Sequence, residues 1–342
     1  DLFRGKEKLQ LSQGQLIEEV IMEAEKGIKG DSSAHNLLLT APTGAGKSLL
    51  FQLPAIYLGN EYKLLTLVVS PLKALIVDQV EALQELGYER VAYASSDLSP
   101  EQKNEVYRRV RDGEVDLFYL SPELLLAYDI SYFVGERRIG LVVVDEAHTV
   151  TTWGKEFRVD YWFLGRHLEA LKNALGYVFP VFALTATAVW NPEGGNDMIF
   201  DTIRSLHLAP CALYVGTVKR KNIGLDITAM TIEEGETYDK AKQRTVAARV
   251  EDFLDGHKTI IYYPFAGGID MKLKTWVYPA NWHWVASYYG KKDKEQKAEI
   301  IQAFKEGEKK IIVATKAFGM GVDIYVFPVF ALTATAVWNP EG

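Results

Sequence analysis

The sequence has almost no cysteine, no long apolar run and no excess of positive charge. Its single cysteine, Cys211, excludes an internal disulfide and a zinc site built from cysteines. No apolar run reaches the roughly 18 to 20 residues that a membrane-spanning helix needs, and the amino terminus lacks the apolar centre of a signal peptide. We therefore expect a cytoplasmic protein with no membrane partner and no zinc, in which oxygen ligands would hold any metal.

The composition is that of an ordinary folded protein. The 342 residues carry a formal net charge of -7, with 48% hydrophobic and 24% charged residues. This balance is typical of globular chains and unlike that of disordered or fibrous ones. The length predicts two domains that each bury a core. The negative net charge does not exclude nucleic acid as a partner, because the positions of the basic residues decide that question.

Short apolar runs alternate with segments of helical period in the first half of the chain. The expected strands are residues 37–40, 64–70, 115–120, 141–144 and 181–184. Between the second and third of these, one helical face is formed by Leu72, Leu75, Ile76, Val80, Leu83 and Leu86. Strands that alternate with helices predict an α/β fold, in which helices cover a parallel sheet.

The second half repeats this pattern over a shorter length. Strands are expected at residues 259–263 and 310–314, and a helix at 294–305 would be buried through Ala298, Ile301 and Phe304. Two α/β units joined near residues 205–222 are therefore predicted. The expected division is a first domain at 1–212, a partial second domain at 213–324 and a tail at 325–342.

The tail duplicates an earlier part of the chain. Residues Tyr177–Gly194 recur letter for letter as Tyr325–Gly342, and nothing similar lies between the two copies. Repeat proteins show imperfect repetition at a fixed period over several units. A recent duplication or an artefact therefore explains the copy better than a functional repeat does. We expect the tail to be disordered or to pair weakly at a sheet edge, where Pro328 would be tolerated.

One glycine-rich stretch lies between an expected strand and an expected helix. It reads Ala41-Pro-Thr-Gly-Ala-Gly-Lys-Ser48, and in this context it predicts a phosphate-binding loop. Small residues let backbone N–H groups converge on phosphate oxygens, Lys47 adds a positive charge, and Ser48 offers a hydroxyl to Mg²⁺. The candidate ATP-binding residues are Thr43, Gly44, Ala45, Gly46, Lys47 and Ser48. The alternative is a glycine-rich turn with an incidental lysine.

A pair of carboxylates follows the expected strand 141–144. The strand ends in Asp145-Glu-Ala-His148, which places both acids at the carboxyl edge of a parallel sheet, where open α/β sheets bind ligands. We expect Asp145 to help hold Mg²⁺ and Glu146 to orient and deprotonate the attacking water, as phosphoryl transfer requires. With Lys47, these are the candidate catalytic residues.

These two elements together resemble the DExH branch of the superfamily 2 helicases. Three further stretches are similar to motifs Ia, Ib and III of that family, namely Ser70–Gln79, Tyr119–Leu124 and Thr185–Thr187. The resemblance implies that the first two line a path for single-stranded DNA and that Thr185 and Thr187 couple the nucleotide to DNA. It also suggests Gln15 as a reader of adenine.

The stretch after the acidic pair narrows the resemblance to the RecQ type. Residues Thr149–Tyr161 are similar to the aromatic-rich loop of that family, in which Trp153, Phe157 and Arg158 would sense DNA together with His148. Aromatic faces stack on bases of any sequence, although Trp153 and Phe157 could also be ordinary core residues. Ile260–Pro264 is like motif IV, and Val313–Asp323 closely resembles motif V, in which Thr315 would lie near DNA and Asp323 near the ribose.

The resemblance implies two RecA-like domains, the second incomplete, with ATP and Mg²⁺ in the cleft between them. The expected activity is a 3′ to 5′ DNA helicase that acts on single-stranded or partly duplex DNA in repair and recombination. No Gln-x-x-Gly-Arg-x-Gly-Arg segment follows residue 324, so the arginine finger of motif VI is expected to be missing. A nucleotide- and DNA-binding module with little turnover is therefore the alternative. The oligomeric state is left open.

Overall fold

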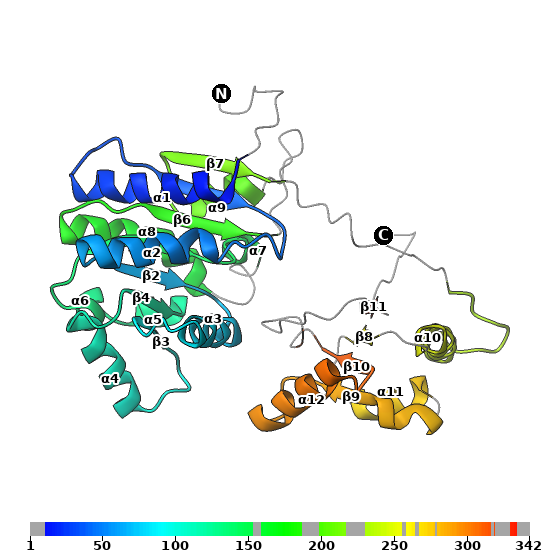
Figure 1. The fold of residues 1–342 in the computed structure, drawn as a ribbon. Helices are drawn as coiled ribbons and strands as arrows, with labels where there is room; N and C mark the ends of the chain where they lie inside the picture. Colours follow the sequence, from blue (N-terminus) through cyan, green and yellow to red (C-terminus); the bar gives the residue numbers. More distant parts are fainter. Residues whose placement is uncertain are drawn as a thin grey trace. The chain divides into compact units, whose positions relative to one another are not determined.

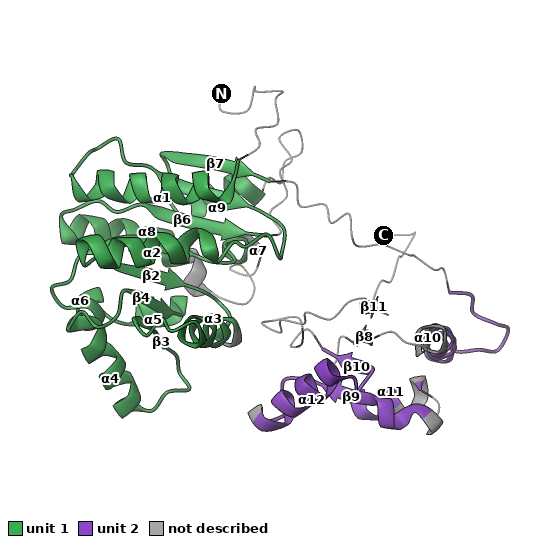
Figure 2. Cartoon of the chain, in the orientation of Figure 1, with its two compact units in different colours: residues 1–223 green, residues 224–342 purple. Residues whose placement is uncertain are grey.

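The computed structural model divides the chain into two compact units, Asp1–Ile223 and Gly224–Gly342 (Figure 2). The described residues are 11–152, 159–186, 198–216, 230–254, 258–263, 267–277, 279–315, 318 and 329–333. Among the described helices, none is long and apolar enough to cross a membrane.

Unit 1 is built on a parallel sheet of seven strands in the order β3-β4-β2-β5-β6-β1-β7 (Figure 1). The strands are β1 (Asn36–Thr40), β2 (Leu65–Val69), β3 (Val91–Ala94), β4 (Leu117–Leu120), β5 (Ile139–Val144), β6 (Val181–Thr185) and β7 (Cys211–Val215). Each of the neighbouring pairs is parallel. The α/β class with a parallel sheet, expected from the sequence, is confirmed.

Helices cover both faces of this sheet, because successive side chains of a strand point to opposite faces. One core joins strand residues such as Leu39 and Val68 to three helices, α1 (Gln13–Ile28), α2 (Leu49–Tyr62) and α3 (Lys73–Glu85). The other core joins Leu38 and Leu67 to the remaining helices. These are α4 (Pro100–Arg111), α5 (Pro122–Ala127), α6 (Ile130–Val134), α7 (Thr149–Thr152), α8 (Val159–Leu175) and α9 (Met198–Ser205).

Three details of unit 1 differ from the sequence analysis. Strand β3 was not expected, and β7 lies within the expected linker and crosses the boundary placed at residue 212. β7 pairs with β1 along its whole length, which makes it part of the first sheet. Leu86 was expected on the buried face of its helix, but it is 84% exposed because α3 ends at Glu85 and Leu86 is its cap.

Unit 2 contains a smaller parallel sheet in the order β11-β8-β10-β9. Its elements are α10 (Tyr238–Leu254), β8 (Lys258–Tyr262), α11 (Ile269–Trp276), the 3₁₀ helix η1 (Pro279–Trp284), β9 (Val285–Tyr288), α12 (Lys294–Glu306), β10 (Ile311–Ala314) and β11 (Val329–Thr333). α12 buries Phe304 completely and Ile301 partly, as expected, but Ala298 is exposed. The second sheet confirms the expectation of two RecA-like domains.

The duplicated tail supplies β11. This strand repeats the five residues of β6, Val-Phe-Ala-Leu-Thr. β6 lies inside the first sheet between β5 and β1, whereas β11 lies at the edge of the second sheet and pairs in parallel with β8. The same five residues therefore form a central strand in one unit and an edge strand in the other.

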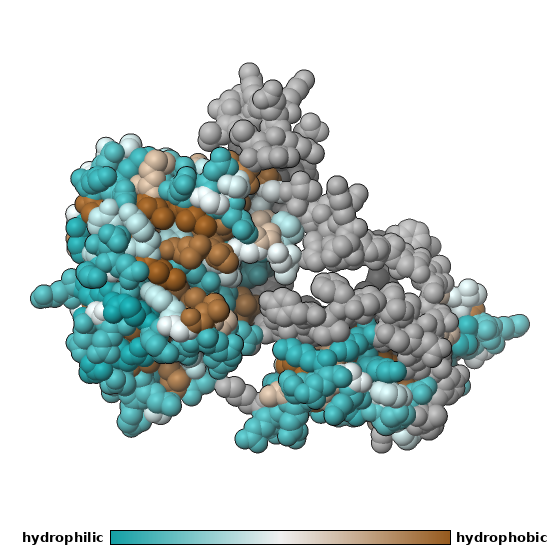
Figure 3. All heavy atoms as spheres, in the orientation of Figure 1, coloured by the Kyte–Doolittle hydropathy of each residue, from teal (hydrophilic) through white to brown (hydrophobic). Residues whose placement is uncertain are grey.

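An apolar strip runs along the outer side of α2. Leu49, Leu53 and Tyr57 follow one another at intervals of four residues, and each is more than a third exposed, as is Met22 of the neighbouring α1. A spacing of four residues places side chains on one helical face. Figure 3 shows apolar residues gathered on this face of unit 1.

Candidate active site

The glycine-rich stretch forms a loop between the end of β1 and the start of α2. Gly44 and Gly46 have φ angles of +81° and +73°, a backbone region that glycine enters without the strain of a side chain. A turn closes where the Ala45 N–H donates to the Pro42 carbonyl (3.1 Å). The loop thus leads into the amino terminus of α2, where the helix dipole favours anions.

The side chain of Lys47 contacts the start of this loop. Its Nζ atom donates to the carbonyl oxygens of Ala41 and Pro42, each at 3.2 Å. Burial lowers the pKa of Lys47, whereas the nearby carboxylates of Glu146 and Asp145 act in the opposite direction. The structure therefore brings the lysine of the loop into the electrostatic range of both predicted acids.

Asp145 is buried at the carboxyl end of β5. Its N–H donates to the Val69 carbonyl (2.9 Å), which continues the pairing of β5 with β2. Burial, reinforced by the adjacent Glu146, raises the pKa of Asp145 to about 6. A buried carboxylate with a raised pKa gains stability from a bound cation. Asp145 and the Ser48 hydroxyl are oxygen donors of the kind that Mg²⁺ prefers, and they suit that ion chemically.

Gln79 also contacts this carboxylate. Its side chain, from α3, lies close enough to Asp145 to favour the ionised form and so to lower the pKa of the carboxyl, against the effect of burial. The sequence analysis assigned Gln79 only to a stretch near DNA and missed this contact. The available signal was its position at the end of the motif Ia stretch, because α3 follows β2 and β2 is the neighbour of β5.

Glu146 occupies a strained turn. Its φ angle is +48°, a left-handed conformation that is uncommon outside glycine and that often marks a functional site. The Glu146 N–H donates to Asp145 Oδ1 (2.9 Å), and its own carbonyl accepts from the Thr149 hydroxyl (2.9 Å). These two bonds hold the peptide on either side of the Glu146 side chain, which is itself only partly buried.

His148 joins the acidic pair to β6. Its Nδ1 atom lies 3.2 Å from Glu146 Oε2 and 3.0 Å from Thr185 Oγ1. The Thr185 carbonyl in turn accepts the Ala41 N–H (3.0 Å) at the first residue of the phosphate loop. Thr185 therefore contacts the phosphate loop directly and the acidic pair through His148.

Two glutamines at the start of α1 take different positions. Gln15, the expected adenine reader, is part of a capping box: its Oε1 accepts the Ser12 N–H (2.8 Å), and Ser12 Oγ accepts the Gln15 N–H (3.2 Å). Gln13 instead donates from Nε2 to the Ala45 carbonyl of the phosphate loop (2.9 Å). A contact in which both the oxygen and the nitrogen of the Gln15 amide bind adenine would require Oε1 to leave the cap.

Of the remaining site residues expected from the sequence, the structure describes one. Thr315 belongs to unit 2, where it follows β10 and donates its N–H to the Tyr288 carbonyl (3.1 Å). Five more lie outside the described residues, namely Trp153, Phe157, Arg158, Thr187 and Asp323.

A cavity of about 210 Å³ lies at the opposite edge of the first sheet, near the starts of β1 and β6. Lys172 lines it, and burial lowers the pKa of this lysine to about 8. Asn36 Oδ1 accepts from Lys172 Nζ (3.3 Å) and from the Val181 N–H (2.8 Å). These contacts tie α8, β1 and β6 together, and they lie away from the phosphate loop.

A group of acids and a histidine lies near the same edge. In the part of the chain that the structure describes, Glu19, Glu23 and His35 bring potential metal-binding atoms within 4.8 Å of one another. Glu23 is already engaged, because it accepts from Lys26 Nζ (2.6 Å) and from the His35 N–H (2.8 Å). The group is therefore explained by internal contacts.

Comparisons with known proteins match both units. The DEAD/DEAH box helicase family matches residues 15–193, and the helicase conserved C-terminal domain matches residues 243–341. The first match contains the phosphate loop, the acidic pair and Thr185.

Similar curated proteins are RecQ-family helicases. The chain is 30% identical over 302 residues to the ATP-dependent DNA helicase RecQ of Haemophilus influenzae, which covers 87% of this chain and 44% of that protein. It is 32% identical over 298 residues to the probable ATP-dependent DNA helicase RecS of Bacillus subtilis, covering 85% of this chain and 53% of that protein. The chain thus spans about half the length of these relatives.

Solved structures share the fold at low sequence identity. The helicase Lhr of Mycobacterium smegmatis, bound to single-stranded DNA and AMP-PNP, matches with a TM-score of 0.62 and 22% identity, over 92% of this chain and 43% of that one. The DUF1998 helicase MrfA, bound to DNA and AMPPNP, matches with a TM-score of 0.67 and 17% identity, over 96% of this chain and 47% of that one.

The sequence motifs resemble those of RecQ-type superfamily 2 helicases, and the family match and the curated relatives support the same family. The chain therefore belongs to the DEAD/DEAH box helicases, and its curated relatives within that family are RecQ-type DNA helicases.

Proposed function

We propose that the chain binds ATP with Mg²⁺ at the carboxyl edge of the first sheet and hydrolyses it to move along single-stranded DNA. The observation that carries this proposal is the convergence of three loops at that edge. Lys47 follows β1, Asp145 and Glu146 follow β5, and Thr185 ends β6, which lies between β5 and β1. Together these loops supply a phosphate cradle, a cation ligand and a base.

The roles of the side chains follow from their chemistry. The loop N–H groups and the Lys47 ammonium would bind the phosphates, while Ser48 and Asp145 would hold Mg²⁺, which neutralises charge on the phosphates when it is bound. Glu146 would accept the proton of the attacking water as the water oxygen bonds to the γ-phosphorus and the bond from that phosphorus to the β–γ bridging oxygen breaks, which releases ADP. Its strained backbone is consistent with a side chain placed for such a task.

The proposal that DNA is the partner rests on the relatives and on two contacts of His148. The relatives are named ATP-dependent DNA helicases, and 3′ to 5′ movement is our proposal by similarity to the RecQ type. The contacts of His148 with both Glu146 and Thr185 would carry a signal between DNA and the acidic pair. Trp153, Phe157 and Arg158, outside the described residues, are proposed to sense DNA.

The Lys47→Ala variant tests the site as a whole. We expect a loss of ATP affinity of roughly ten- to hundredfold, because a charge-assisted contact with the phosphates is removed. Calorimetric titration with Mg-ATP measures this, and circular dichroism should show an unchanged fold because Lys47 is not a core residue. An unchanged ATP affinity would refute the assignment of the phosphate loop.

The rate of ATP hydrolysis separates a motor from a binding module. A DNA-stimulated ATPase in the wild-type chain supports a translocase. Tight binding of ATP and DNA without turnover would instead support the alternative module. Duplexes with a single-stranded tail at either the 3′ or the 5′ end then test the proposed polarity.

The duplicated segment offers a matched control for Thr185. The Thr185→Val variant keeps the side-chain volume but removes the hydroxyl that contacts His148 Nδ1 (3.0 Å). We expect DNA stimulation of hydrolysis to fall about fivefold, equivalent to the loss of one hydrogen bond, with a smaller change in ATP affinity. Thr333→Val makes the identical change in the identical local sequence and should be silent. Equal effects of the two variants would show that the hydroxyl of Thr185 is not the coupling element.

A further inference from the structure

Gln13 contacts the phosphate loop, although it lies 32 residues away in the sequence. Its Nε2 atom donates to the Ala45 carbonyl at 2.9 Å. The start of α1 determines this placement, because the capping box of Ser12 and Gln15 makes Gln13 the first helical residue. Side chains two residues apart in a helix point about 200° apart. Gln13 and Gln15 therefore cannot both face the loop.

The hydrogen bond that the Ala45 carbonyl accepts from Gln13 restrains one peptide of the loop. A trans peptide is planar, and its carbonyl and N–H point in opposite directions. Gln13 holds the Ala45 carbonyl toward α1, so the Gly46 N–H of the same peptide points away from α1. In a loop that leads into a helix amino terminus, N–H groups turned in this way are the donors for phosphate oxygens.

A side chain at residue 46 would displace the amide of Gln13 from this contact. A Cβ atom placed on Gly46 would lie 2.5 Å from Gln13 Nε2, closer than real atoms approach. The φ angle of +73° also favours glycine at this position. Gly46 thus serves both the turn of the loop and the close approach of Gln13.

We propose that Gln13 is a positioning residue for the polyphosphate of the nucleotide. By holding the Ala45 carbonyl, it orients the Gly46 N–H toward the phosphates and acts independently of the base. This inference rests on the proposed function. It differs from the role expected for Gln15, because a residue that reads adenine discriminates between bases and one that orients the loop does not.

The test compares the affinities of the wild-type chain and of two variants for three ligands. Gln13→Met retains the approximate length of the side chain but removes the donor, and Gln15→Ala is the matched control on the same helix. Affinities for ATP, GTP and inorganic tripolyphosphate are measured by calorimetry in the presence of Mg²⁺. We expect Gln13→Met to weaken all three by a similar factor of about two- to tenfold, the range of one hydrogen bond. Gln15→Ala should leave tripolyphosphate affinity unchanged, because Ser12 Oγ still accepts the backbone N–H of residue 15 and keeps Gln13 at the start of α1.

The outcomes separate this inference from the function on which it rests. Unchanged affinities in Gln13→Met, or a loss confined to ATP, would overturn the positioning role while Lys47→Ala still reported on the site. An equal loss of tripolyphosphate affinity in Gln15→Ala would show that any damage to the start of α1 has this effect, which also overturns the inference. A wild-type chain that binds none of the three ligands would refute the proposed function itself. Thermal melting confirms that both variants are folded, as expected for exposed side chains.

Discussion

Replacement of Glu146 by glutamine is expected to lower the rate of ATP hydrolysis by about 10²- to 10⁴-fold, the usual contribution of a general base. The amide has nearly the same shape but cannot accept a proton from water. The backbone bonds on either side of residue 146 do not involve its side chain, so the turn should persist. Single-turnover kinetics with Mg-ATP measure the effect.

The control for Glu146→Gln is the affinity for Mg-ATP, which should change little, in contrast to Lys47→Ala. His148 contacts the same carboxylate, because its Nδ1 lies 3.2 Å from Glu146 Oε2. A Glu146→Gln chain that hydrolyses ATP near the wild-type rate would show that another group activates the water. Loss of binding together with turnover would instead assign Glu146 to the phosphate site.

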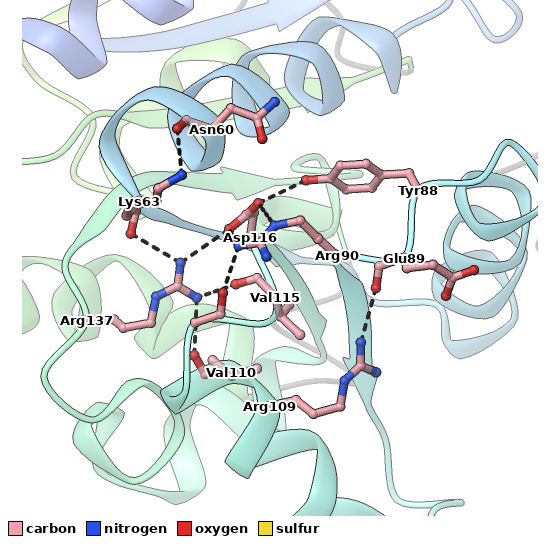
Figure 4. Close-up of polar contacts among 11 residues, drawn as sticks. Asn60, Lys63, Tyr88, Glu89, Arg90, Arg109, Val110, Val115, Asp116 and Arg137 are labelled. Atoms are coloured by element: carbon pink, nitrogen blue, oxygen red, sulfur yellow. Dashed lines mark hydrogen bonds and ion pairs between the residues drawn. The ribbon is translucent and has the colours of Figure 1, made fainter.

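The Asp116→Ala substitution is expected to destabilise unit 1 by about 3–5 kcal/mol, the range found when one partner of a buried ion pair is removed. Asp116 is completely buried at the amino end of β4. It accepts from Arg90 Nε and Nη2 (2.6 and 2.8 Å) and lies 3.4 Å from Arg137 Nη2 (Figure 4). Tyr88 adds a hydroxyl at 3.3 Å. Alanine would leave two guanidinium groups without their shared carboxylate.

This cluster connects several elements of the fold. Arg137 also donates to the carbonyls of Val110, Val115 and Lys63. A Cβ atom on Gly59 of α2 would lie 2.3 Å from Asp116 Cγ, so the helix approaches the carboxylate closely. The cluster lies at the amino ends of the strands, whereas the candidate active site lies at the carboxyl ends.

A surface acid provides the comparison for Asp116. Asp112 contacts Arg108 at 2.6 Å, but its side chain is 53% exposed. Asp112→Ala should cost at most about 1 kcal/mol, as exposed pairs usually do. Urea denaturation followed by circular dichroism compares the two variants. Equal and small effects would show that water or rearranged carbonyls satisfy the two arginines without Asp116.

Much of the candidate site could be predicted from the sequence because its residues lie in short continuous motifs. The loop from Ala41 to Ser48 and the pair Asp145 and Glu146 each follow an apolar strand. A parallel sheet brings the carboxyl ends of its strands to one edge. The position of each motif directly after a strand was therefore enough to place the loop and the acids at the same edge of the sheet.

Contacts between distant segments could not be predicted in this way. Gln79 and Gln13 reach Asp145 and Ala45 from separate helices, and both depend on the angle at which a helix packs. Sequence similarity favoured Gln15 over Gln13, and only the cap of α1 shows which of the two faces the loop. β7 was likewise missed, because its five residues become a strand by pairing with β1.

The duplicated segment separates local from tertiary causes most clearly. The sequence by itself determined that Val-Phe-Ala-Leu-Thr forms a strand, since apolar and β-branched residues suit a buried parallel sheet, and both copies do so as β6 and β11. Only the tertiary structure decided that β6 lies between two neighbours and contributes Thr185 to the site, whereas β11 pairs with β8 at an edge. The physical reason is that a strand gains its hydrogen-bond partners and its neighbouring side chains from segments far away in the sequence.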